Sequence, residues 1–177
     1  MLIGDPRTFA IECHHEPEGH HRNVFGRMCI HAAGKVLGDI AEPVCMLDVT
    51  AKHLKDTLLH LSRLDDPALS TLSDADAFNF LDRTLYLDDT RSDAELARDT
   101  ERYYVFDFLT NGGESFDRTK SFVARSGRQI RLLFTDEADQ FHSAHVPLAL
   151  FEATISAFLS WIEHERGALM RQSNPQE

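Results

Sequence analysis

The chain has 177 residues, of which 42% are hydrophobic and 27% charged, and its formal net charge is −11. This size and composition are typical of a globular protein, so we expect one domain over residues 1–177 and exclude a disordered or fibrous chain. A strongly acidic chain disfavours nucleic-acid and anionic membrane partners. The sequence shows no apolar run of roughly 20 residues that could cross a bilayer and no secretory signal. We therefore expect a cytoplasmic protein.

The N-terminal part of the chain predicts three antiparallel strands in a meander. Residues 9–13 and 24–33 are β-like runs with a polar loop between them, and residues 36–40 form a short third run after a turn at Gly34-Lys35. Gly4-Asp5-Pro6 has the composition of a turn that leads into the first strand. Pro43 ends the meander.

The next stretch, residues 48–102, predicts two or three helices between two groups of strands. In the first, Asp48 or Thr50 can cap the N-terminus, and Pro67 ends the helix because it disfavours a helical residue before it. Its apolar stripe consists of Leu54, Leu58, Leu61 and Leu64.

Two further helices are indicated by their first residues. Ser73 can cap the second helix, with Asp76 three residues later in the position of a capping box. The apolar stripe of this helix consists of Phe78, Leu81 and Leu85. A more polar third helix is predicted over residues 92–102.

Strands are predicted again over residues 103–109, 120–125 and 128–135, with hairpin-loop residues at Ser126-Gly127. Pro147 then suits the first turn of a long helix. Its apolar stripe consists of Leu148, Phe151, Ile155, Phe158 and Ile162. Gly167 is the predicted stop, and residues 171–177 are expected to form a flexible tail.

This order of elements predicts an α+β fold. Strands and helices come in separate runs, which favours an antiparallel sheet with helices packed on it rather than alternating β-α-β units. The sheet is built from the N-terminal meander and the later strands, and it carries the two or three central helices and the long C-terminal helix.

Histidine and cysteine side chains concentrate in the first hairpin. Side chains alternate between faces along a strand, so Cys13 shares a face with His15, and Cys29 with His31. If the two strands paired in the right register, these four residues could bind zinc. The alternative is that the histidines, which include His14, His20 and His21, cap a solvated hairpin end while the cysteines are small core residues. The lack of CxxC spacing also suits reduced thiols.

The sequence shows no motif of an enzyme. It contains no G-x-S-x-G, Walker-type or H-E-x-x-H pattern, so we expect no catalysis and no cofactor. A small basic cluster on the last hairpin consists of Arg118, Lys120, Arg125, Arg128 and Arg131. This cluster is too small for a nucleic-acid footprint. It suits pairing with the acidic part of the chain or with a carboxylate-bearing partner, or it forms a solvated strand face.

Negative charge concentrates in residues 65–114, which we call the acidic segment. It holds 13 acidic and 4 basic residues, so it carries −9 of the net −11. The candidate partner-binding residues are Asp65, Asp66, Asp88, Asp89, Asp93, Glu95 and Asp99. Such a surface suits a cationic protein partner, for example a nuclease whose groove holds phosphates, because complementary charge speeds association. Candidate anchors for the partner are Tyr86, Tyr103, Phe106 and Phe108, although the phenylalanines also suit a core.

The opening sequence MLIGDPRTFAIE resembles a family of bacterial immunity proteins from polymorphic-toxin and contact-dependent growth inhibition systems. Members start with an IGDP segment, continue into an F-A-I strand, and carry a G-K turn and a G-D strand end, here Gly34-Lys35 and Gly38-Asp39. The likeness covers roughly the first 40 residues, and the histidines between Cys13 and His31 depart from it.

This resemblance implies a small cytosolic antidote that binds the C-terminal domain of a cognate toxin, often a nuclease. We therefore expect an immunity protein that neutralises its toxin stoichiometrically through the acidic surface. The alternatives are a metal-binding or hydrolytic protein that uses the first hairpin, and an interaction module with an unrelated partner.

Overall fold

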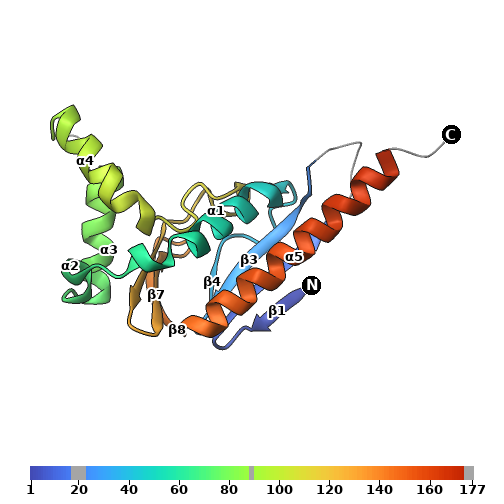
Figure 1. Cartoon of the computed structure of the whole chain (residues 1–177), viewed down its shortest axis with the longest axis horizontal. Helices are drawn as coiled ribbons and strands as arrows, with labels where there is room; N and C mark the ends of the chain where they lie inside the picture. Colours follow the sequence, from blue (N-terminus) through green and yellow to red (C-terminus); the bar gives the residue numbers. More distant parts are fainter. Residues whose placement is uncertain (17–22, 88–89, 174–177) are drawn as a thin grey trace.

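Two antiparallel sheets and the helices on them make up the computed structural model in Figure 1. The structure describes residues 1–16, 23–87 and 90–173. The predicted α+β class, with an N-terminal meander, central helices and a long C-terminal helix, is confirmed. The meander and the later strands form two separate sheets, however, and not the one sheet that was predicted. Whether the chain is a single domain over its whole length stays a prediction.

The first sheet has the strand order β1-β2-β3-β4, and β5 pairs with β3 beside this path. Its strands are β1 (Leu2–Asp5), β2 (Phe9–His15), β3 (Phe25–Ala32), β4 (Lys35–Leu37) and β5 (Cys45–Met46). The meander extends further than predicted, because residues expected to form a turn form the edge strand β1. At Gly4, with φ of +100°, an added Cβ would lie 2.4 Å from the Phe9 carbonyl oxygen, so only glycine lets β1 approach β2 this closely. The turn follows, where the Thr8 N–H donates to the Asp5 carbonyl at 2.9 Å.

The first helix, α1 (Leu47–Leu59), starts without a side-chain cap, so the predicted capping role of Asp48 or Thr50 is wrong. Asp48 instead accepts from the Val24 N–H at 2.6 Å and pairs with Arg166 of the C-terminal helix. The α-helix ends earlier than predicted, and a 3₁₀ turn, η1 (Leu61–Leu64), continues the chain. A short helix, α2 (Pro67–Ser70), follows where the sequence indicated only a stop.

The next two helices confirm their predicted starts. Helix α3 (Asp74–Asp82) is capped by Ser73, which accepts from the Asp76 N–H at 3.2 Å. A π-helical turn, η2 (Arg83–Leu87), extends it. Helix α4 (Asp93–Tyr103) begins with a complete capping box between Ser92 and Glu95.

The strand predicted over residues 103–109 is wrong. Tyr103 is the last residue of α4, and a 3₁₀ turn, η3 (Tyr104–Phe106), follows it. From this stretch, Asp107 forms an isolated bridge with Phe122. A further 3₁₀ turn, η4 (Glu114–Phe116), leads to the second sheet.

The second sheet has the order β6-β7-β8, with strands β6 (Ser121–Ser126), β7 (Gln129–Thr135) and β8 (Phe141–Pro147). Its first hairpin was predicted, whereas β8 was not, because this strand buries only Ala144 and Val146 and its other residues are polar or partly exposed. Helix α5 (Leu148–Ser173) starts directly after Pro147, as predicted. It runs through Gly167, so the predicted stop there is wrong; residues 171–173 belong to the helix, and residues 174–177 of the predicted tail lie outside the described residues.

Helix α5 covers one face of the first sheet and joins it to the rest of the core. It packs against β1, β2 and α1, and the Phe151 ring lies 5.0 Å from the Phe9 ring and 5.9 Å from the Phe108 ring. Helix α3 packs against β7 and β8. In Figure 1, α3 and α4 form the end of the molecule that lies away from the C-terminal end of α5. Among the described residues, no helix combines the length and apolar character needed to cross a bilayer.

Candidate functional site

The described part of the acidic segment includes α2, α3 and α4, and α3 and α4 lie at the end of the molecule away from the C-terminal end of α5. Of the predicted partner-binding residues, Asp65, Asp93 and Glu95 are exposed. The side chains of Asp65 and Asp93 make no hydrogen bond or ion pair within the described part of the chain. Asp88 and Asp89 lie outside the described residues.

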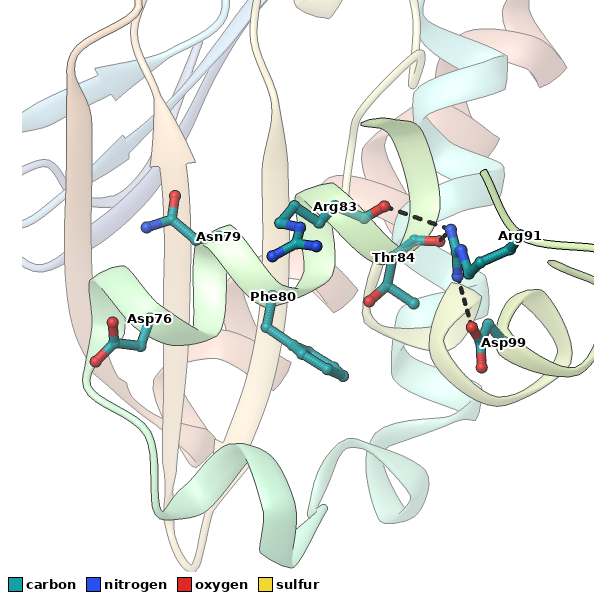
Figure 2. Close-up of a pocket in the computed structure, with 7 residues that line it drawn as sticks. All are labelled: Asp76, Asn79, Phe80, Arg83, Thr84, Arg91 and Asp99. Atoms are coloured by element: carbon teal, nitrogen blue, oxygen red, sulfur yellow. Dashed lines mark hydrogen bonds and ion pairs between the residues drawn. The ribbon is translucent and has the colours of Figure 1, made fainter. Parts of the chain in front are cut away.

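Arg91 connects α4 to the end of α3 (Figure 2). Its guanidinium donates to Asp99 at 2.5 Å and to the Thr84 carbonyl at 2.7 Å, with a longer contact of 3.4 Å to the Arg83 carbonyl. The ion pair between Arg91 and Asp99 therefore holds α4 beside η2. The same side chains border a pocket of about 460 Å³ between α3 and α4, lined also by Asp76, Asn79 and Phe80.

A second ion pair holds the other end of α4. Arg102 donates to Asp66 at 3.2 Å, and Asp66 also caps α2 by accepting from the Ala68 N–H at 2.7 Å. Asp66 and Asp99 both hold α4 through an ion pair. Their predicted contact with a partner stays a prediction.

Two residues of the predicted basic cluster neutralise part of the acidic segment. Arg131 on β7 pairs with Asp74 at 2.7 Å, and Lys120 pairs with Asp82. When these two cations are counted with the acidic segment, it holds 13 acidic and 6 basic residues. The region thus remains strongly negative after its internal pairing.

A larger pocket, of about 610 Å³, lies between α1 and the end of α4. Tyr104, with 53% of its surface exposed, and Asp107 border it. Burial raises the pKa of Asp107 to about 6, although a 2.9 Å hydrogen bond from the Tyr86 hydroxyl acts in the opposite direction. Burial also lowers the pKa of His53, which borders the same pocket. The pocket therefore places an exposed aromatic ring beside a carboxyl group.

Most of the predicted anchors lie in the core. Phe106 and Phe108 are fully buried and Tyr103 nearly so, while Tyr86 is partly exposed and hydrogen-bonded to Asp107. Tyr104 is an exposed aromatic residue that the sequence did not single out. A strand would place Tyr103 and Tyr104 on opposite faces without telling which of them is buried. Nothing in the sequence therefore indicated that Tyr103 packs into the core at the end of a helix.

The four-residue metal site that the sequence left open as an alternative in the first hairpin does not form. The register of β2 and β3 pairs Cys13 with Met28 and Glu12 with Cys29, which places Cys13 and His15 on the helix-covered face and Cys29 and His31 on the other. His15 bonds Glu165 of α5 at 2.7 Å. His20 and His21 lie outside the described residues.

Thiol chemistry is also disfavoured, because burial raises the pKa of both Cys13 and Cys29 to about 12. A protonated thiol is a poor nucleophile at neutral pH. The hairpin therefore offers no activated cysteine.

The comparisons with known proteins agree with this fold. A family model described as Immunity protein 42 matches residues 1–161. The crystal structure of CdiI from Burkholderia dolosa AUO158 is similar, with a TM-score of 0.67 and 18% sequence identity over 91% of this chain and 99% of that chain. At this identity the likeness concerns the fold. No curated protein matches the chain.

Proposed function

Because the chain belongs to the immunity protein 42 family, we propose that it neutralises a cognate toxin domain by stoichiometric binding, without catalysing a reaction. It acts in the cytoplasm of the cell that makes it, within a contact-dependent growth inhibition system. The similarity of its fold to that of CdiI supports this assignment.

The proposed contact surface is the acidic segment. The observation that carries it is the charge of residues 65–114, which hold 13 acidic residues against 6 basic ones when Lys120 and Arg131 are counted with them. The described part of this segment includes α2, α3 and α4 at one end of the molecule. A nuclease active site must attract phosphates and is therefore cationic, so an acidic surface both steers the encounter and covers the groove. We accordingly propose that the toxin is a basic nuclease.

Exposed groups on this side can supply affinity as well as charge. Asp65 and Asp93 present carboxylates, and Tyr104 presents an aromatic ring next to the larger pocket. Aromatic residues in a partly concave surface are frequent energetic centres of interfaces. The ion pairs of Asp66 and Asp99 hold α4 in place before binding, which lowers the ordering cost of association.

The test is to mix the purified protein with the toxin domain encoded beside its gene. We expect a 1:1 complex by size-exclusion chromatography with light scattering, and nuclease activity that falls to zero at one equivalent. Inhibition at far below one equivalent would indicate catalysis and contradict the proposal, as would the absence of a complex. Toxin binding is favoured over the metal-binding or hydrolytic alternative, because the four ligands named for that alternative lie on opposite faces of the sheet.

A further inference from the structure

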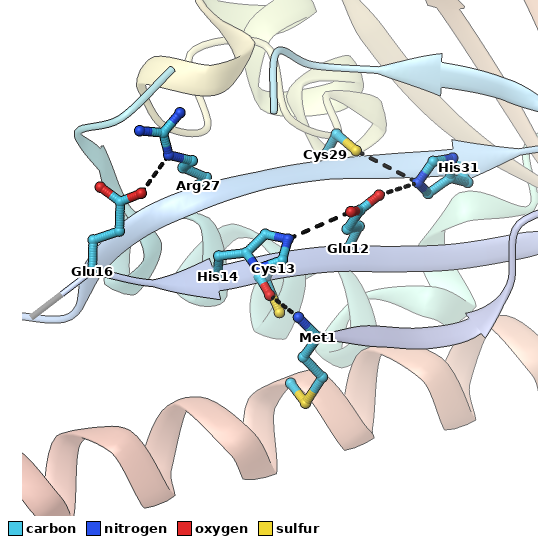
Figure 3. Close-up of polar contacts among 8 residues, drawn as sticks. All are labelled: Met1, Glu12, Cys13, His14, Glu16, Arg27, Cys29 and His31. Carbon is cyan, nitrogen blue, oxygen red and sulfur yellow. Dashed lines mark hydrogen bonds and ion pairs between the residues drawn. The ribbon is translucent and has the colours of Figure 1, made fainter. Parts of the chain in front are cut away.

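Three possible metal ligands converge on the face of the first sheet that α5 does not cover (Figure 3). Glu12 on β2 lies directly opposite Cys29 on β3, and His31 follows two residues later on the same face. One ligand atom from each residue lies within 4.8 Å of the others. His31 Nε2 is 2.9 Å from Glu12 Oε2 and 3.6 Å from Cys29 Sγ.

Two of the three separations are close to those around a tetrahedral zinc ion. With Zn–S near 2.3 Å and Zn–N near 2.0–2.1 Å, a tetrahedral site places sulfur and nitrogen about 3.5 Å apart and oxygen and nitrogen about 3.3 Å apart. The observed sulfur–nitrogen distance of 3.6 Å matches the first value. The oxygen–nitrogen pair, now in hydrogen-bond contact, needs to open by a few tenths of an ångström.

We propose that Glu12, Cys29 and His31 bind one zinc ion on the outer face of the first sheet. Thiolate, imidazole and carboxylate together form a donor set typical of zinc, and three protein ligands leave the fourth position to water. The thiolate and the carboxylate balance the charge of the ion. Binding releases the proton of the Cys29 thiol to solvent, because zinc binds a cysteine as the thiolate.

His14 has a supporting role in this site. Its Nε2 lies 3.4 Å from Glu12 Oε1, the carboxylate oxygen that does not contact His31. Such a contact orients the ligand carboxylate toward the metal. The His14 side chain is half exposed.

The site depends on the reduced state and on the register of two strands. Cys29 is a free thiol with 1% of its surface exposed. The ring of His31 lies beside it. A bound ion cross-links β2 and β3, and it stabilises the folded chain in proportion to the logarithm of the zinc concentration. None of these residues belongs to the acidic segment, so this proposal stands independently of toxin binding.

The first experiment titrates untagged, chelator-stripped protein with Zn²⁺ in competition with a chromophoric chelator, and with Co²⁺ under reducing conditions. We expect one equivalent of Zn²⁺, and a Co²⁺ complex with thiolate charge-transfer absorption and tetrahedral d–d bands. Cys29→Ala abolishes the charge-transfer band, His31→Gln and Glu12→Gln each weaken Zn²⁺ binding by about 10-fold or more, and His14→Gln weakens it less.

The matched controls are on the same strands or the same hairpin. Cys13→Ala and His15→Gln alter the opposite face of the sheet, so both variants keep full Zn²⁺ affinity and the Co²⁺ spectrum. Circular dichroism and thermal unfolding confirm that each variant is folded. Lack of stoichiometric binding, a Co²⁺ complex without thiolate absorption, or binding that is lost in the control variants but kept in Cys29→Ala would each overturn the proposal.

Discussion

The guanidinium of Arg131, on β7, lies 2.7 Å from the carboxylate of Asp74 in the first turn of α3. It also donates to the carbonyl oxygens of Leu69 at 2.9 Å and Leu72 at 3.1 Å, at the end of α2. Only 7% of the Arg131 side chain is exposed. One buried cation therefore attaches the start of the acidic helices to the second sheet.

Replacing Arg131 with alanine should destabilise the protein strongly. The change removes the cation that pairs with Asp74 and leaves two backbone carbonyls without their donor, and breaking a buried pair of this kind costs about 3–5 kcal/mol. His145 still donates to Asp74 at 3.0 Å, so we expect a loss of about 3 kcal/mol in urea unfolding. The control is Arg118→Ala, which breaks two contacts of an exposed arginine and should cost under about 1 kcal/mol. Equal losses in the two variants would contradict the anchoring role of Arg131.

Local sequence signals predicted the elements whose ends are fixed by their own residues. Ser73 caps α3 as expected, and α4 begins where the third helix was predicted, because a cap needs only a side chain and the backbone two or three residues later. The hairpin at Gly127, with φ of +59°, is equally local. The strand expected over residues 103–109 failed because apolar and aromatic composition suits a buried turn as well as a strand.

The candidate site was less predictable because its contacts span long distances along the chain. Asp66 pairs with Arg102 and Asp74 with Arg131, and no local pattern tells which acids are paired and which stay exposed. The hairpin shows the same limit. A strand pattern places Cys29 and His31 on one face, but only the register decides that Glu12, and not Cys13, joins them.

The buried carboxyl group of Asp107 predicts a pH-dependent stability difference. Burial raises its pKa from 3.8 to about 6 in the folded protein, so the protonated form stabilises the fold fully below pH 4 and this contribution is lost as the pH rises through 6. An asparagine side chain at this position stays neutral at every pH and can still accept from Tyr86. We therefore expect Asp107→Asn to equal the parent protein near pH 4 and to exceed it by up to about 3 kcal/mol above pH 7.

Urea unfolding at half-unit pH steps measures this difference. Asp117→Asn serves as the control, because Asp117 is exposed and its substitution should leave the pH profile unchanged. A stability difference for Asp107→Asn that is the same at pH 4 and pH 8 would show that the carboxyl group does not titrate in this range.

Arg91 and Asp99 should determine how firmly α4 is held. Asp99→Asn removes the charge of the 2.5 Å contact, and a partly buried pair of this kind contributes about 1 kcal/mol. We expect amide hydrogen exchange in α4 to become about five times faster while exchange in β7 is unchanged. The control is Glu101→Gln, a neutralising change at an exposed residue of the same helix. If both variants accelerate exchange equally, the effect reflects helix charge rather than the Arg91 contact.

Reversing the exposed charges of the acidic segment should slow association with the toxin domain. In the double variant Asp65→Lys and Asp93→Lys, the surface loses four units of negative charge without losing an internal ion pair of the described chain. We expect the association rate constant at low ionic strength to fall by about 10-fold, with a weaker salt dependence and a nearly unchanged dissociation rate, as measured by stopped-flow fluorescence.

The matched control for this variant is Asp117→Lys with Glu152→Lys, which makes the same change in net charge at exposed residues outside the acidic segment. Net charge alone acts on both variants alike, so only a local field at the docking surface separates them. Because steering depends on where the charge lies, the control should lose less than about threefold in rate. Equal slowing in both variants would mean that the toxin responds to the overall charge of the protein, and the acidic segment would then have to be abandoned as the contact surface.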